Sequence, residues 1–232
     1  MFSGTIQSTV KSSGNMAKTW LMLLVLLYTT LSGCSTINSA RQAQAPDASF
    51  IPAVETAPPQ NPYLTERSAV PVNASRRFEH SKLAIEQGEW LNAKTQLHSL
   101  VQDYPELSGP YLNLALVYLH LQDPDQADHW FKQSIDRNNN NLLAYNQYGI
   151  FLREQGRFEQ AESIYLQALA IWEPHADTHR NIGILYDLYL GDKKNALQHF
   201  YRYQALQDSK DKVVAGWIID LERQLSSAGK VN

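Results

Sequence analysis

The chain has 232 residues, of which 44% are hydrophobic and 19% are charged, a composition typical of one compact domain with additional segments. Its 20 Lys and Arg residues against 23 Asp and Glu residues give a net charge of −3, and this balance does not favour nucleic-acid binding, which needs clustered basic side chains. Cys34 is the only cysteine, which excludes an intramolecular disulfide.

The N-terminal segment has the layout of a secretory signal. Lys18 precedes an apolar run at 20–28, and small residues follow the run. The run is shorter than the roughly 20 apolar residues that a transmembrane helix needs. We therefore expect residues 1–33 to be a signal peptide. Met16 is a better start than Met1, because a compact basic segment follows it directly.

This signal ends in Leu31-Ser32-Gly33-Cys34, which resembles a lipobox, the site where bacterial lipoproteins are diacylated on the cysteine and cleaved before it. The alternative is an ordinary signal peptide with a chance cysteine. The resemblance implies that fatty acids such as palmitate on Cys34 hold the protein in a membrane leaflet. Ser35 rather than aspartate follows the cysteine, which by enterobacterial-type sorting implies the outer membrane and its periplasmic face.

The segment 34–72, which begins with the lipidated cysteine, differs in composition from the rest of the chain. Six prolines stand among Ala, Gln, Ser and Thr, with few bulky apolar residues. Such a segment cannot bury enough apolar surface to offset the entropy lost on ordering. We expect it to be a flexible, partly polyproline tether. It either holds the following domain away from the lipid surface or is a merely tolerated linker.

After this segment, small residues recur with a regular period. One set, in steps of 34 residues, is Ser81, Ala115, Gly149 and Gly183. A second set, in steps of 34, 34 and 35 residues, is Ala93, Ala127, Ala161 and Ala196. A period of 34 resembles that of tetratricopeptide repeats, in which two antiparallel helices pack closely at small residues. Because no single helix pair can bury its apolar face alone, such pairs stack on one another.

The resemblance implies an all-α fold, a right-handed superhelical stack of about four helix pairs. Within residues 73–208, we expect the repeats at about 74–107, 108–141, 142–175 and 176–209. The segment 210–227 carries an amphipathic stripe without a partner helix, and we expect it to be a helix that caps the fourth repeat.

Two repeats depart from the pattern of the family. The first has Arg77 and His80 where large apolar residues are usual, which predicts a solvent-facing end of the stack. The fourth carries one extra residue, because the segment 188–190 precedes Gly191 where two residues would normally fit. This insertion predicts a lengthened first helix or a bulged turn.

The sequence contains no motif of an enzyme. It has no His-Glu-x-x-His and no glycine-rich phosphate loop, and its cysteine lies outside the repeats. We therefore expect no catalytic residue, no cofactor and no enzymatic activity. His175 and His179 have a spacing that metal pairs use, but the repeat pattern favours packing and loop positions for them, so we expect no metal site.

In the repeat family, the first helix of each pair lines an inner groove that binds a partner. The resemblance assigns nine residues to this groove: Leu112, Leu116, Leu119, Asn146, Ile150, Arg153, Arg180, Ile184 and Asp187. Asn side chains can hydrogen-bond a peptide backbone, and Arg side chains can pair with a carboxylate. The basic pattern with which chaperone-binding relatives hold an acidic C-terminal tail is absent. The alternative for each residue is an exposed face without a ligand.

One stretch within the repeats suggests a partner. Residues 146–157, Asn-Gln-Tyr-Gly-Ile-Phe-Leu-Arg-Glu-Gln-Gly-Arg, resemble the Asn-Asn-Tyr-Gly-x-Phe-Leu-Cys-x-Gln-Gly-Arg stretch of type IV pilus pilotin lipoproteins, which help the secretin ring assemble. Arg153 stands where that family has cysteine, and that family has more repeats.

We therefore expect a periplasm-facing outer-membrane lipoprotein that acts as a protein–protein interaction scaffold in the assembly of cell-envelope complexes. Its partners would be an envelope protein or peptide in the groove and the membrane through the lipid on Cys34, with no nucleic acid. Two alternatives remain. One is a pilotin-like factor for secretin assembly, and the other is an adaptor that recruits peptidoglycan hydrolases.

Overall fold

The structure, a computed structural model, describes residues 60–65 and 70–228. The signal peptide, Cys34 and most of the tether lie outside these residues. All elements in the described part are helical, in agreement with the predicted all-α class. They follow one another as α1 (Pro62–Thr65), α2 (Val72–Glu86), α3 (Trp90–Asp103), α4 (Ser108–His120), α5 (Pro124–Arg137), α6 (Leu142–Glu154), α7 (Phe158–Ile171), α8 (Ala176–Leu185), the π-helical turn η1 (Tyr186–Leu190), α9 (Lys193–Ala205) and α10 (Lys212–Ala228).

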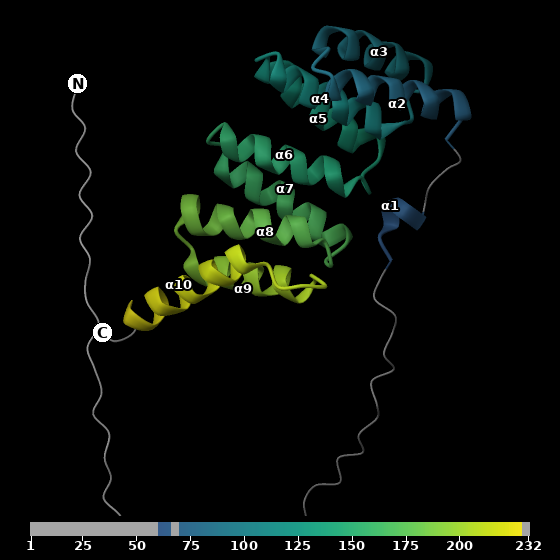
Figure 1. Ribbon diagram of the computed structural model, residues 1–232. Helices are drawn as coiled ribbons and strands as arrows, with labels where there is room; N and C mark the ends of the chain where they lie inside the picture. The colour runs from purple at the N-terminus through teal and green to yellow at the C-terminus, as the bar shows by residue number, and fades with distance from the viewer. Residues whose placement is uncertain (1–59, 66–69, 229–232) are drawn as a thin grey trace, which may run out of the picture. The chain divides into compact units, whose positions relative to one another are not determined.

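Helices α2 to α9 form four antiparallel pairs that stack in chain order (Figure 1). The two helices of each pair pack closely, and the second helix of a pair also contacts the first helix of the next. Helix α10 packs against α9 at the end of the stack. The predicted stack of helix pairs with a terminal helix is therefore confirmed.

The tether prediction needs correction at two places. Residues Pro62–Thr65 form one turn of helix, because the Asn61 side chain accepts a hydrogen bond from the backbone N–H of Tyr63 and proline suits a first helical position. In addition, α2 begins at Val72, the residue assigned to the end of the tether.

Close contact between paired helices depends on glycine in the first helix. A Cβ atom added at Gly149 of α6 would lie 2.3 Å from Cε1 of Tyr165 in α7, and one added at Gly183 of α8 would lie 2.6 Å from Cε1 of Phe200 in α9. Both aromatic rings are almost fully buried. The recurring small residues therefore do what the spacing predicts: they let a large ring lie directly on the neighbouring backbone.

The turns inside the helix pairs share one backbone conformation. Gly88, Gly156 and Gly191 have φ angles of 75°, 71° and 69°. Gln122 takes the same position in the second repeat with a φ of 60°, although side chains other than glycine rarely adopt this region.

The extra residue of the fourth repeat is taken up by η1. The N–H of Gly191 bonds to the carbonyl of Tyr186, five residues back, where an α-helix would bond four back. Beyond this turn, Phe200 still lies on Gly183 as Tyr165 lies on Gly149. The predicted lengthening or bulging of the first helix is confirmed as a π-helical turn.

The first repeat ends the stack with a polar face. Arg77 donates hydrogen bonds to Asp103 at 2.8 Å and to Ser99 at 2.8 Å, and His80 is exposed. These are the two positions where the family has large apolar residues. The polar substitutions agree with the predicted solvent-facing end.

Candidate functional site

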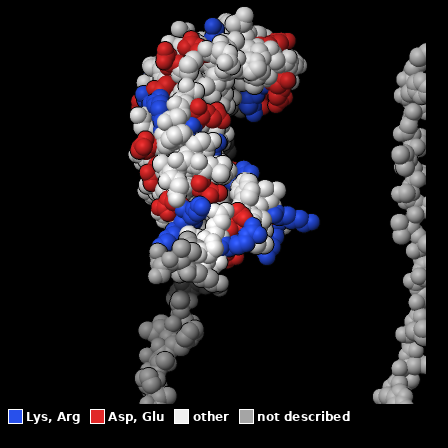
Figure 2. Space-filling view, turned by 90° about the vertical axis from the view of Figure 1, so that its left-hand side faces the viewer, with Lys and Arg blue, Asp and Glu red and all other residues white. Residues whose placement is uncertain are grey.

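The first helices of the pairs form the inner side of the stack. Helix α2 contacts α4, and α6 contacts α8, although each pair of first helices is separated by a second helix in the chain. Direct approach of these helices is expected on the concave side of a curved stack of repeats. Figure 2 shows the stack hollowed on one side. This geometry agrees with a groove lined by first helices, as the repeat pattern predicts.

The apolar residues assigned to this groove differ in exposure. Leu112 is only 3% exposed and belongs to the core between the repeats. Leu116, Leu119, Ile150 and Ile184 are half-buried, so each leaves part of its surface to solvent. Leu112 thus supports the packing, whereas the other four can offer apolar surface to a partner.

Asn146 connects two first helices. Its side chain is 4% exposed, and its Oδ1 accepts a hydrogen bond of 2.9 Å from Nδ2 of Asn181 in α8. Two amides that bond each other satisfy part of their hydrogen-bonding capacity inside the protein. Asn146 therefore aligns α6 with α8. Asn181 was not among the predicted groove residues. It stands one position beyond that of Asn146 in the repeat register, and only this place could have indicated the pair.

The two arginines assigned to the groove lie over aromatic rings. The guanidinium carbon of Arg153 is 6.0 Å from the ring centroid of Tyr189 in η1, and that of Arg180 is 5.6 Å from the ring of Trp217 in α10. Both arginines are half-buried. Nε and Nη1 of Arg153 and Nε of Arg180 are enclosed and have no hydrogen-bond partner. The repeat pattern predicts both arginines but neither aromatic contact.

Asp187, the last residue assigned to the groove, lies half-buried in η1. Burial raises the pKa of its carboxyl, Lys193 opposes this rise, and Asp220 reinforces it. The groove therefore has arginine charge at Arg153 and Arg180 and an acidic group at its η1 end.

A second polar cluster lies between α8 and α9. Nδ1 of His179 is 2.9 Å from Nδ1 of His199, and Nε2 of His179 is 3.0 Å from the carbonyl oxygen of Glu173. Glu173 in turn pairs with Arg202. Burial lowers the pKa of His179 and lowers that of His199 to about 4, so both rings are neutral near pH 7. One ring then donates to the other.

His175 has a different partner from His179. Its Nδ1 lies 2.6 Å from Oγ1 of Thr178, whereas His179 faces His199. Within residues 60–65 and 70–228, no three His, Cys, Asp or Glu side chains gather as metal ligands would. The spacing of the two histidines therefore corresponds to two separate hydrogen-bonding roles.

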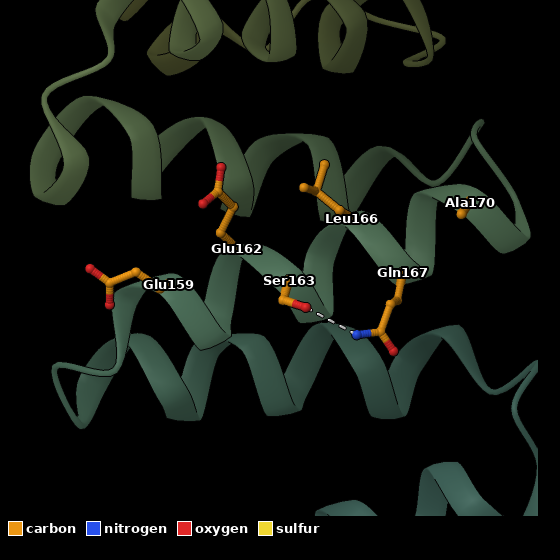
Figure 3. Close-up of a pocket in the computed structure, with 6 residues that line it drawn as sticks. All are labelled: Glu159, Glu162, Ser163, Leu166, Gln167 and Ala170. Atoms are coloured by element: carbon orange, nitrogen blue, oxygen red, sulfur yellow. Dashed lines mark hydrogen bonds between the residues drawn. The ribbon is translucent and has the colours of Figure 1, made fainter.

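A shallow hollow of about 510 Å³ lies beside α7 (Figure 3). All six residues that line it come from this one helix: Glu159, Glu162, Ser163, Leu166, Gln167 and Ala170. Ser163 and Gln167 hydrogen-bond each other, and Glu162 accepts a hydrogen bond from the hydroxyl of Tyr186. Small-molecule sites instead bring polar groups together from several elements. This hollow lacks the convergence of an active site.

None of the helices in the described part of the chain combines the length and hydropathy needed to span a bilayer. This finding concerns only those helices.

Two segments of the chain match models of the tetratricopeptide repeat, at residues 109–141 and 140–209. Together they cover the second, third and fourth helix pairs. The boundary between the matched segments falls at the start of α6, where the third pair begins.

Two curated proteins are related in sequence. The chain is 24% identical to the type IV pilus assembly protein PilF of Pseudomonas aeruginosa over 131 residues. This aligned region covers 56% of this chain and 52% of PilF. It is 28% identical to the protein O-mannosyl-transferase TMTC2 of Homo sapiens over 97 residues. This aligned region covers 40% of this chain and 12% of TMTC2. The chain thus spans about half of the first relative and a small part of the second.

Solved structures share the fold. The structure of P. aeruginosa PilF has a TM-score of 0.59 at 22% identity, over 66% of this chain and 69% of that one. YrrB, a tetratricopeptide repeat protein with an unusual peptide-binding site, has a TM-score of 0.50 at 21% identity, over 61% of this chain and 72% of that one. The matched models and the common fold show that residues 109–209 are tetratricopeptide repeats, a fold suited to binding peptides or proteins.

Proposed function

We propose that this chain is an outer-membrane lipoprotein, facing the periplasm, that acts as a protein–protein interaction scaffold in type IV pilus assembly. The similarity to PilF over 131 residues carries this proposal, because PilF is a type IV pilus assembly protein. Residues 146–157, which resemble the pilotin stretch, form most of α6 and the turn into α7, at the centre of the matched repeats.

The lipid anchor in this proposal rests on the N-terminal sequence. An apolar run followed by Leu31-Ser32-Gly33-Cys34 supports lipidation of Cys34, and two or three acyl chains on one cysteine would anchor the protein stably. The proline-rich segment after it would let the repeats reach a partner at some distance from the lipid surface.

The role of the repeats in this proposal is to hold a segment of an envelope partner. Half-buried apolar side chains along the first helices, together with the two arginines, supply both contact area and polar anchors. A few such anchors give most of the affinity of protein interfaces. The pilus secretin is the partner that the pilotin resemblance favours.

Anchoring is tested with a fatty-acid analogue that labels lipoproteins metabolically. We expect label on the wild-type protein in the outer-membrane fraction, and neither label nor membrane association for Cys34→Ala. Label that persists in Cys34→Ala would contradict the anchor.

The assembly role is tested in a strain that lacks the protein. We expect loss of assembled secretin on gels and of surface pili, with rescue by the wild-type protein and weak rescue by Cys34→Ala. Chemical crosslinking followed by affinity purification identifies the partner directly. Normal secretin assembly and piliation in the deletion strain would contradict the pilus role.

A further inference from the structure

Arg153 and Arg180 stand apart from most other arginines in the described part of the chain, because each of four others holds a carboxylate. These four pairs are Arg77–Asp103, Arg157–Asp128, Arg202–Glu173 and Arg223–Asp220. Among the residues that the structure describes, no acidic side chain pairs with Arg153 or Arg180, although both are half-buried and have enclosed N–H groups without an acceptor. A half-buried guanidinium without a carboxylate keeps an uncompensated positive charge, which favours an anionic ligand.

Arg157 differs from these two arginines in its partners. Arg157 is also half-buried, and its Nη1 donates to Oδ1 of Asp128 at 2.6 Å, while its Nε donates to Gln160 at 3.0 Å. The fold therefore supplies partners for the half-buried guanidinium in the turn between α6 and α7. It leaves two such groups without partners on first helices.

Each of these two guanidinium groups also lies over an aromatic ring. A ring attracts a guanidinium through its π-electrons, so this contact uses none of the N–H donors in a hydrogen bond. Arg153 of α6 lies over Tyr189 of η1, and Arg180 of α8 lies over Trp217 of α10. The rings therefore restrict the side-chain orientations without using the donors.

One charged group lies near Arg180, but its hydrogen bonds go to other residues. The carboxylate of Asp211 lies close enough to Arg180 for the charges to interact: the N–H of Val214 and the charge of Arg180 both lower its pKa. However, its oxygens accept hydrogen bonds from the hydroxyl of Tyr203 and the N–H groups of Val213 and Val214. Near Arg153, the hydroxyl of the fully buried Tyr165 also lacks a hydrogen-bond partner.

We propose that Arg153 on Tyr189 and Arg180 on Trp217 form two carboxylate-binding positions, and that the partner segment in the groove carries Asp or Glu side chains between apolar residues. This inference rests on the proposed scaffold function and specifies the chemistry of its partner. The half-buried Ile150 and Ile184, which stand on the same two helices as the arginines, would contact the apolar residues of that segment.

The probe is a short synthetic peptide of alternating apolar and Glu residues, compared with a twin that has Gln in place of every Glu. Binding to the full-length protein is measured by calorimetry. We expect the Glu peptide to bind and its Gln twin to bind roughly 10- to 100-fold more weakly, because hydrogen bonds to charged groups are the stronger ones. We expect Arg153→Gln and Arg180→Gln each to weaken the Glu peptide by about tenfold.

Two further variants separate orientation from charge. Arg153→Lys keeps the charge but not the planar pair of donors, so it also weakens the Glu peptide. Arg76→Gln is the matched control, because Arg76 is an exposed arginine of α2 that donates to Asn73. It leaves affinity unchanged. Circular dichroism and melting temperature verify that every variant is folded.

Three results would overturn the carboxylate proposal. One is equal affinity for the two peptides, and another is no binding of the Glu peptide at millimolar concentration. The third is arginine-dependent binding of vesicles with anionic phospholipids but not of the Glu peptide. The scaffold function fails separately, if crosslinking in the cell envelope captures no specific partner or the deletion strain assembles pili normally.

Discussion

The third and fourth repeats place a buried aromatic ring on a glycine in the same way, Tyr165 on Gly149 and Phe200 on Gly183, yet they differ elsewhere. Where the third repeat has Tyr145 in α6 and Ile164 in α7, the fourth has the hydrogen-bonded pair His179 and His199. The fourth also contains the π-helical turn η1.

The difference shows which contacts a helix pair must keep. Contact between a ring and a glycine backbone is present in both repeats, because it sets how closely the paired helices approach. The second contact across each pair accepts either apolar side chains or a polar pair, provided that the polar groups hydrogen-bond each other. Sensitivity to mutation and to pH should therefore differ between the two repeats in specific ways.

The largest expected effect comes from adding one methyl group at the glycine contacts. Gly149→Ala and Gly183→Ala should each lower the free energy of unfolding by about 3 kcal/mol, at the upper end of overpacking effects, because a buried ring cannot move away. Chemical denaturation followed by circular dichroism measures the change.

Gly216→Ala in α10 is the matched control, because a Cβ there meets no atom within 4 Å. It should raise stability by about 0.5–1 kcal/mol through helix propensity alone. If the three substitutions changed stability equally, close approach at Gly149 and Gly183 would not limit the packing.

The next effect concerns acid. Burial lowers the pKa of His199 from its usual 6.5 to about 4, so the unfolded chain takes up protons that the folded protein does not. The stability that this difference contributes is complete above pH 6.5 and is lost as the pH falls toward 4. We expect a loss of roughly 1–2 kcal/mol between pH 7 and pH 4.5, allowing for partial exposure. Thermal melting at several pH values measures it.

Replacing the histidine pair with its counterpart from the third repeat tests the source of this loss. His179→Tyr with His199→Ile should flatten the dependence between pH 7 and pH 4.5. The pKa of Glu173 is also lowered, first by its hydrogen bond to Arg202, so the stability that this carboxylate contributes is lost as the pH falls further. An unchanged pH dependence in the double variant would exclude the pair as its source.

The smallest effect concerns the left-handed turns between the two helices of a pair. Gly156→Ala and Gly191→Ala should each lower stability by about 1 kcal/mol, because both residues have a left-handed backbone and no atom lies within 4 Å of an added Cβ. Gln122→Gly, at the same position of the second repeat, should raise stability by a similar amount. Denaturant midpoints of the three variants compare these turns. A larger loss at Gly191 would mean that η1 adds constraints of its own.

The helix pairs could be predicted from the sequence because their contacts repeat. Each small residue of a first helix recurs at the same place in the repeat, and so does the large residue of the second helix that packs on it. The spacing alone therefore identifies which positions meet. The Asn146–Asn181 bond and the His179–His199 pair do not recur in this way. They depend on which side chains meet across one particular junction, and repeat register gives the face of a helix but not the partner of a side chain.

The aromatic contacts of the arginines were harder to foresee. The ring over Arg153 comes from Tyr189, whose position depends on the backbone of η1, and the ring over Arg180 comes from a helix outside the repeats. The short helix α1 was missed for a similar reason. The proline-rich composition of segment 34–72 indicates a lack of core, whereas the local hydrogen bond of Asn61 determines the turn.

The π-helical turn also has a consequence for how such arrays change length during evolution. One residue inserted into a continuous α-helix rotates every later side chain by about 100°, which would move an entire buried stripe out of register. Here the insertion falls in the last turn before Gly191, and the wider backbone loop absorbs it, so that α9 keeps its alignment with α8. The end of a first helix is therefore a position where a lineage can gain or lose a residue and keep its packing. New surface side chains such as Leu188 and Tyr189 can arise there without changes elsewhere.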